Sequence, residues 1–182
     1  MGTDTVTSGQ LNLIKELRRF WEQQVMWMRF FIISKIAGHD DLEYVTQRLF
    51  SNSRDFFYLL RVFFGDAQAE RFARFLTFHM SNIGQLIDAL KNNDRETADR
   101  LTVQLNQNAR EMASFFAQMN PFWEEEQWTQ LLYNLVTLTI NQIVARLSGN
   151  YADDIITFDK NDENAYKIAD YLANGIIYSF TG

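Results

Sequence analysis

The chain has 182 residues, of which 47% are hydrophobic and 22% charged, so its composition is that of a globular domain and excludes a disordered chain. It contains 8 glycines and 1 proline, too few for the frequent turns of an all-β protein, so helix is expected to dominate. The absence of cysteine excludes disulfides, thiol nucleophiles and cysteine metal sites, and it favours a reducing, cytoplasmic location.

The formal net charge of −6 is unevenly distributed. Residues 1–110 hold 14 Lys and Arg against 13 Asp and Glu, whereas residues 111–182 hold 3 against 10. This acidic C-terminal part argues against nucleic acid as a partner. The longest uncharged run, residues 127–145, carries several amides and threonines, so it predicts a core helix and no membrane span.

Glycine, proline and capping residues divide the chain into helical segments. Apolar side chains at three- and four-residue steps predict a first helix over residues 11–36, which ends at Gly38. Two short helices are expected next. One runs from Asp40 to Leu49, and the other begins at Ser53 and ends at Gly65.

The rest of the chain predicts four long helices. The boundaries of these helices are marked by four features. They are Asp66, which can cap the start of a helix, the Asn-Asn-Asp turn at residues 92–94, Pro121, and the glutamate cluster at residues 124–126, which suits a helix start. The four helices cover about residues 66–91, 94–119, 124–147 and 151–180.

Together the segments predict an all-α fold, an antiparallel bundle of four to five long helices with short helices covering one end. Residues 1–10 are expected to form a flexible N-terminal segment and residues 11–182 a single helical-bundle domain. The almost wholly apolar stretch 56–64 is either buried or a contact surface. Burial of this stretch is the favoured interpretation, and a homodimer that uses the stretch as its interface is the alternative.

Polar side chains recur on the apolar stripes of these helices, where an unpaired buried group is costly. They predict a polar layer inside the bundle. Such a layer either lines a ligand site or is a satisfied hydrogen-bond network that fixes helix packing, and the second interpretation is favoured. The candidate ligand-binding residues of the bundle interior are Gln24, His79, Asn134, Trp21 and Met28.

A divalent-metal site is the alternative, with His79 as a ligand and Glu22, Glu111 or Asp170 as oxygen ligands or base. A di-iron carboxylate bundle is excluded because neither His follows a Glu by three positions. A zinc helix with two histidines four residues apart is excluded because the only two histidines lie 40 positions apart.

Catalytic motifs are also missing, since the chain has no glycine-rich phosphate loop and no Gly-x-Ser-x-Gly elbow. The sequence therefore favours a non-catalytic protein without a cofactor. We expect it to act by protein contacts or by binding a small apolar ligand in its core. The alternative function is a metal-binding protein or metal-dependent enzyme that uses His79 and nearby carboxylates.

The string Trp-Glu-Gln-Gln-Val-Met-Trp at residues 21–27 resembles a group of small bacterial helical-bundle proteins of unknown function with the motif Trp-Glu-Gln-His-Val. The likeness spans most of the chain and includes Asn120-Pro121 with Trp123 and the segment at residues 147–151. Such proteins often carry the label acetylglutamate kinase. That label does not suit this chain, because an amino-acid kinase is a larger α/β protein with glycine-rich loops.

The resemblance implies a buried set of three histidines that looks like a metal-ligand set. Only one of them is matched here, by His79. Gln24 stands at the first position, and Tyr133-Asn134-Leu135 replaces the third motif. A site that needs three imidazoles would therefore be lost in this chain.

Overall fold

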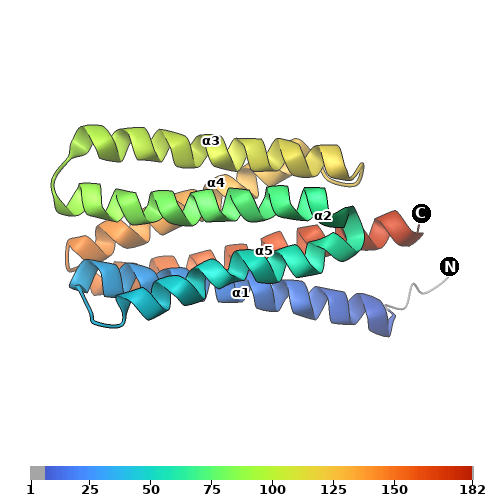
Figure 1. Cartoon of the computed structure of the whole chain (residues 1–182), viewed down its shortest axis with the longest axis horizontal. Coiled ribbons are helices and arrows are strands. Elements are labelled where there is room, and N and C mark those ends of the chain that lie inside the picture. Colours follow the sequence, from blue (N-terminus) through green and yellow to red (C-terminus); the bar gives the residue numbers. More distant parts are fainter. Residues whose placement is uncertain (1–6, 182) are drawn as a thin grey trace.

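The structure is a computed structural model that describes residues 7–181, and it confirms the all-α bundle predicted from the sequence (Figure 1). Connections of a few residues join the helices, as expected for antiparallel neighbours. The helices are α1 (Ser8–Ala37), α2 (Leu42–Lys91), α3 (Arg95–Met119), α4 (Glu125–Leu147) and α5 (Tyr151–Thr181).

Helix α2 is a helical hairpin folded at Gly65, whose backbone has the non-helical angles φ 77° and ψ 169°. The rings of Phe56 and Phe72 lie 5.3 Å apart, centroid to centroid. In one straight helix, 16 residues would separate them by about 24 Å. The chain therefore turns back at Gly65, as Figure 1 shows, and the predicted boundary between Gly65 and Asp66 is confirmed.

The boundary expected at Ser53 is wrong, because residues 42–64 form one continuous helical arm. The hydroxyls of Ser51 and Ser53 donate to the carbonyls of Arg48 and Phe50 within this arm. These local bonds satisfy the hydroxyls inside the helix, so they do not mark a new start. Asn52, between the two serines, is buried and faces α1.

The N-terminal boundary also differs from the expectation. Helix α1 begins at Ser8, because Thr7 and Gln10 form a reciprocal capping box. Residues 8–10 therefore belong to α1 and not to a flexible segment of residues 1–10. Residues 1–6 lie outside the described part of the chain.

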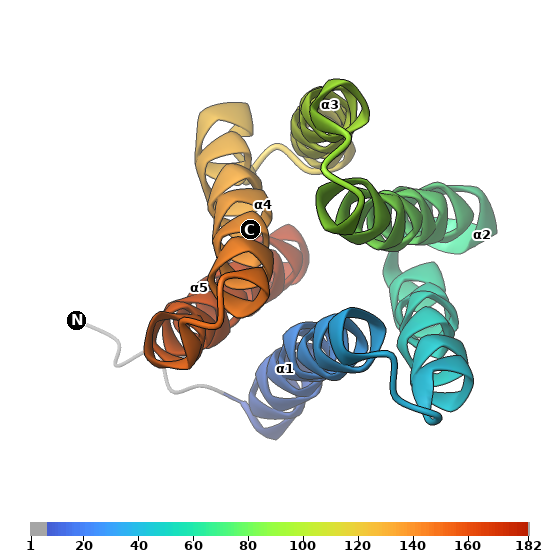
Figure 2. The same cartoon turned by 90° about the vertical axis from the view of Figure 1, so that its left-hand side faces the viewer.

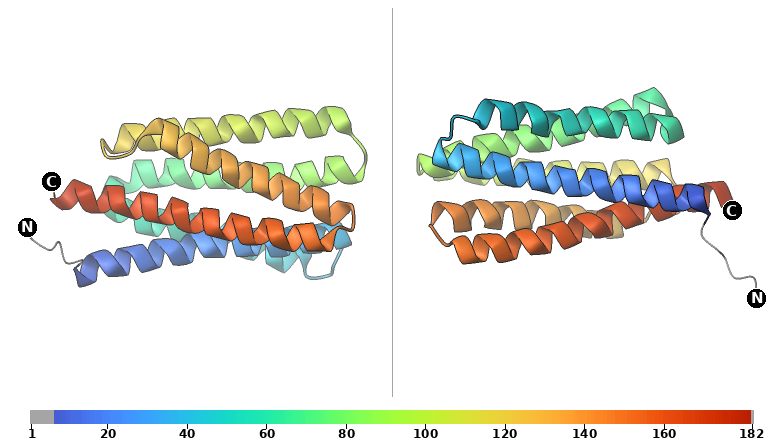
Figure 3. Two further views of the ribbon diagram at one scale, coloured as in Figure 1. Left: turned by 180° about the vertical axis from the view of Figure 1, so that it is seen from behind. Right: turned by 90° about the horizontal axis from the view of Figure 1, so that it is seen from below.

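Seen nearly end on, the helices surround a common core (Figure 2). Helix α1 packs against α2 and α5, α2 against α3, α3 against α4, and α4 against α5, so the first and last helices close the ring. Views from behind and below show the same side-by-side arrangement (Figure 3). In the described chain, no helix is both long and apolar enough for a bilayer crossing.

The core is rich in aromatic side chains, which stabilise it by burying large apolar areas. Trp21 packs edge-on against Phe56, and Phe116 stacks on Trp128 with centroids 4.2 Å apart. The apolar stretch 56–64 contributes one face to this core, since Phe56 and Leu60 are buried. Tyr58 and Val62 face outward, so burial accounts for only part of the stretch.

Candidate functional site

The structure buries most of the predicted interior residues. Gln24 and His79 are 3% and 5% exposed, and Trp21 and Met28 are also buried. Asn134 is exposed, so its assignment to the interior is wrong. Helix α4 instead turns Leu135 and Thr139 inward, because residues four apart share a helix face and the inward face does not include position 134.

Several buried polar residues were missed by the sequence reasoning. For two of them, Asn161 and Asn164, the signal was a polar stripe on α5 that continues into the small residues Ala165 and Ala169 at helical spacing. The buried polar residues that were missed are Ser34, Asn52, Asn82, Asn120, Thr139, Gln142, Asp154, Asn161 and Asn164.

Hydrogen bonds between helices satisfy much of this layer. The amide of Asn52 on α2 donates to Oε1 of Gln24 on α1 over 3.3 Å. Asn164 on α5 donates to the backbone carbonyl of Leu131 on α4 over 3.1 Å. These bonds support the interpretation of the layer as a network that fixes helix packing.

A small cavity lies within the layer and has a volume of about 10 Å³. That is room for roughly one water molecule, far less than an organic ligand needs. All five helices contribute side chains to its wall. The wall is formed by Gln24, Val25, Met28, Leu76, His79, Met112, Leu135, Thr139 and Asn161.

His79 is the titratable member of this wall. Burial penalises the charged imidazolium and lowers the pKa of His79 to about 4. At neutral pH the ring is therefore uncharged, with one nitrogen that donates and one that accepts. None of the described residues forms a hydrogen bond with this ring.

The residues of the predicted metal set do not come together. His79 is in the core, whereas Glu22 and Glu111 are exposed. Asp170 is bound by Arg18 through a bidentate ion pair of 2.6 and 2.7 Å. Within residues 7–181, no group of three or more His, Asp or Glu side chains could hold a metal ion.

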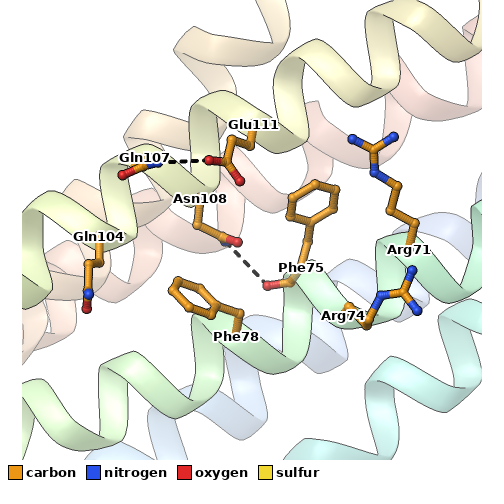
Figure 4. Close-up of a pocket in the computed structure, with 8 residues that line it drawn as sticks. All are labelled: Arg71, Arg74, Phe75, Phe78, Gln104, Gln107, Asn108 and Glu111. Carbon is orange, nitrogen blue, oxygen red and sulfur yellow. Dashed lines mark hydrogen bonds between the residues drawn. The ribbon is translucent and has the colours of Figure 1, made fainter.

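A larger groove of about 570 Å³ lies between the second arm of α2 and α3 (Figure 4). The lining residues follow the same spacing on both helices, i, i+3, i+4 and i+7, so two facing stripes form the walls. Asn108 on α3 donates to the carbonyl of Phe75 on α2 over 3.3 Å and joins the walls. The walls consist of Arg71, Arg74, Phe75 and Phe78 on α2 and Gln104, Gln107, Asn108 and Glu111 on α3.

Charged groups stand at one end of the groove above an aromatic surface. The guanidinium of Arg71 lies 4.8 Å from the ring centroid of Phe115 and 5.8 Å from that of Phe75. It forms no ion pair with any residue in the described range. Glu111 accepts a hydrogen bond from Gln107 over 2.9 Å, and the ring of Phe78 is 45% exposed.

Comparison of the chain with family models, with curated proteins and with solved structures finds no match. The resemblance to the bacterial helical-bundle proteins with the Trp-Glu-Gln-His-Val motif therefore stays a prediction.

Proposed function

We propose that the protein is a non-catalytic binding protein that takes a small amphipathic organic anion in the groove between α2 and α3. The groove itself carries the proposal. Its volume of about 570 Å³ suits a small organic ligand, for which sites commonly enclose about 300–1,000 Å³. The apolar body of the ligand would lie on the rings of Phe75 and Phe78.

Arg71 is the reason for proposing that the ligand is negatively charged. Its guanidinium is positioned by two aromatic rings, yet it has no carboxylate partner among the described residues. A carboxylate that reaches the groove would form a charge-assisted hydrogen bond with it. Arg74 is less available, because it already pairs with Glu70 over 2.9 Å.

This proposal moves the ligand from the core, where the sequence analysis expected it, to the surface. The cavity beside His79 is too small for an organic molecule, whereas the groove is not. Action through protein contacts, the other expectation from the sequence, becomes an outcome of the test. A cytoplasmic location, supported by the absence of cysteine, and independence from nucleic acid belong to the same proposal.

Binding can be tested by titrating ¹⁵N-labelled protein with aromatic and medium-chain carboxylic acids and with their amides as uncharged controls. Saturable NMR shifts are expected for residues 71–78 and 104–111 with the acids, and weaker ones with the amides. Arg71→Gln is expected to weaken binding about tenfold, the loss of roughly 1.4 kcal/mol. Glu111→Gln is expected to strengthen it, because a nearby negative charge is removed.

Arg54→Gln is the matched control, since Arg54 is an exposed arginine outside the groove. It should leave the affinity unchanged. Shifts that fall elsewhere, or equal affinities for the acids and the amides, would contradict an anion site in the groove. If a partner protein causes NMR shifts at the groove residues and none of the acids does, the groove acts through protein contacts and does not bind a small ligand.

A further inference from the structure

The buried cavity beside His79 has the properties of a hydration site. It lies where side chains of all five helices meet, and it has room for roughly one water molecule. Its wall is mixed, with apolar side chains such as Met28 and Met112 and polar groups from four helices. A buried water usually bonds to two to four polar groups, so the polar groups of the wall decide whether one is held.

Asn161 supplies a buried acceptor. The hydroxyl of Thr139 donates to the carbonyl of Leu135 over 2.7 Å, so its oxygen can only accept from Asn161. The amide nitrogen of Asn161 therefore faces Thr139, at 3.3 Å, and the amide oxygen points elsewhere. That oxygen is buried and has no hydrogen-bond partner among the described protein atoms. Leaving such an acceptor unpaired costs about 1–3 kcal/mol.

Two further polar groups of the wall keep unused hydrogen-bonding capacity. The oxygen of Gln24 accepts from Asn52, while its amide nitrogen bonds to none of the described residues. The uncharged ring of His79 also has no such bond within residues 7–181. Gln24 thus offers a donor, and His79 offers a donor and an acceptor.

We propose that the cavity binds a single water molecule that donates to Oδ1 of Asn161 and bonds to Gln24 and His79. The water joins α5 to α1 and α2 at the centre of the bundle. A neutral guest fits better than a metal cation, because no carboxylate lines the cavity and a buried cation would need one to offset its desolvation. This inference is independent of the groove and of any ligand there.

The water can be detected by NMR, because a long-lived internal water gives nuclear Overhauser effects to nearby methyl protons. Cross-peaks to the water resonance are expected for the methyl groups of Met28, Met112 and Thr139 in the full chain. Asn161→Leu should abolish them, since it removes the acceptor and fills the space. Asn164→Leu, at an equally buried asparagine of the same helix outside the cavity, should retain them.

A crystal structure of the unmodified chain is the second measurement, and it does not depend on any variant folding. It should contain one water within hydrogen-bond distance of Oδ1 of Asn161. A dry cavity, a metal ion at that position, or methyl cross-peaks that persist in folded Asn161→Leu would each overturn the proposal.

Discussion

At the scale of single residues, His79 links the interior of the bundle to solution pH. Its pKa in the folded protein is about 4, well below the ordinary value of 6.5, because burial disfavours the charged ring. The unfolded chain therefore binds a proton at this residue at a higher pH than the folded chain does. The contribution of the uncharged ring to stability is complete above pH 6.5 and is lost as the pH falls towards 4.

We expect the free energy of unfolding to fall by about 3 kcal/mol through His79 between pH 6.5 and pH 4. His79→Leu should remove this part of the pH dependence. Urea denaturation at a series of pH values measures the difference between the variant and the original chain. His39→Gln, at the exposed histidine, is the control and should keep the full dependence. Parallel pH profiles for His79→Leu and the original chain would disprove this role.

Gly175 is a second residue whose effect can be predicted. A Cβ atom at this position would lie 1.8 Å from Nε1 of Trp123, the indole nitrogen that donates to the carbonyl of Tyr171. Gly175→Ala must therefore displace the connection between α3 and α4 from α5. We expect a loss of about 3 kcal/mol in the free energy of unfolding, measured with urea.

Gly9→Ala serves as the control for Gly175→Ala. A Cβ at Gly9 meets only the hydroxyl of Thr7, at 3.9 Å, and alanine favours helix there. This variant should be neutral or slightly stabilising. Equal stabilities for the two alanine variants would show that Trp123 does not pack against Gly175.

At the scale of elements, the hairpin in α2 depends on a backbone conformation that only glycine adopts readily. The angles of Gly65, φ 77° and ψ 169°, lie in a region that is essentially restricted to glycine. Gly38, after α1, instead has φ 69° and ψ 42°, a left-handed conformation that asparagine tolerates. A Cβ would meet no atom within 4 Å at either position, so the backbone alone distinguishes the two.

Gly65→Asn should lower the free energy of unfolding by about 2 kcal/mol, because the strained conformation must be kept for the hairpin to close. Gly38→Asn should cost less than about 1 kcal/mol. Thermal and urea denaturation of both variants measure the difference. Comparable losses in the two variants would refute the hairpin geometry at Gly65.

The helices were predictable to different degrees for physical reasons. Gly38 and Gly65 permit backbone conformations that other residues avoid, and Pro121 fixes its own φ angle, whatever surrounds them, so the boundaries that these three residues mark are found in the structure. Ser53 acts through its side chain, which can cap a helix or bond within one, and the sequence does not decide between the two. The inward face of α4 likewise depends on its packing against α5, which is why Asn134 was placed wrongly.

The groove could not be predicted for a related reason. Its two stripes, at residues 71–78 and 104–111, each follow ordinary helical spacing and mix charged, polar and aromatic side chains. Only the packing of α2 against α3 makes them face each other. The central cavity, in contrast, was foreseen in part, because Gln24 and His79 interrupt apolar stripes.

At the scale of the whole molecule, a buried carboxylate connects the first helix with the last two. Asp154 on α5 is 1% exposed and binds Arg29 on α1 at 2.8 Å and Arg146 on α4 at 3.0 Å. Both guanidiniums also lie over aromatic rings, Arg29 over Phe158 and Arg146 over Tyr151. One side chain thus holds three helices together.

Asp154→Asn should lower the free energy of unfolding by about 2–3 kcal/mol, because it leaves two partly buried cations without their counter-charge. Asp170→Asn removes a similar bidentate contact, with Arg18, at the surface and should cost less than about 1 kcal/mol. Urea denaturation of both variants measures these losses. The effect of Asp154→Asn should persist in high salt, and a loss that disappears there would contradict it.

The hairpin at Gly65 also decides at which end of the bundle the last helix ends. Because α2 turns back at Gly65, the described chain runs along the bundle six times. The N-terminal end of α1 and the C-terminal end of α5 therefore lie at the same end of the bundle (Figure 3). Phe63, next to the turn of the hairpin, contacts Phe180, near the C-terminal end of α5, with ring centroids 6.1 Å apart. Fluorophores attached beside residues 8 and 181 would therefore exchange energy efficiently in the native chain. A fusion partner joined there would leave the opposite tip, with Gly38 and Gly149, unobstructed.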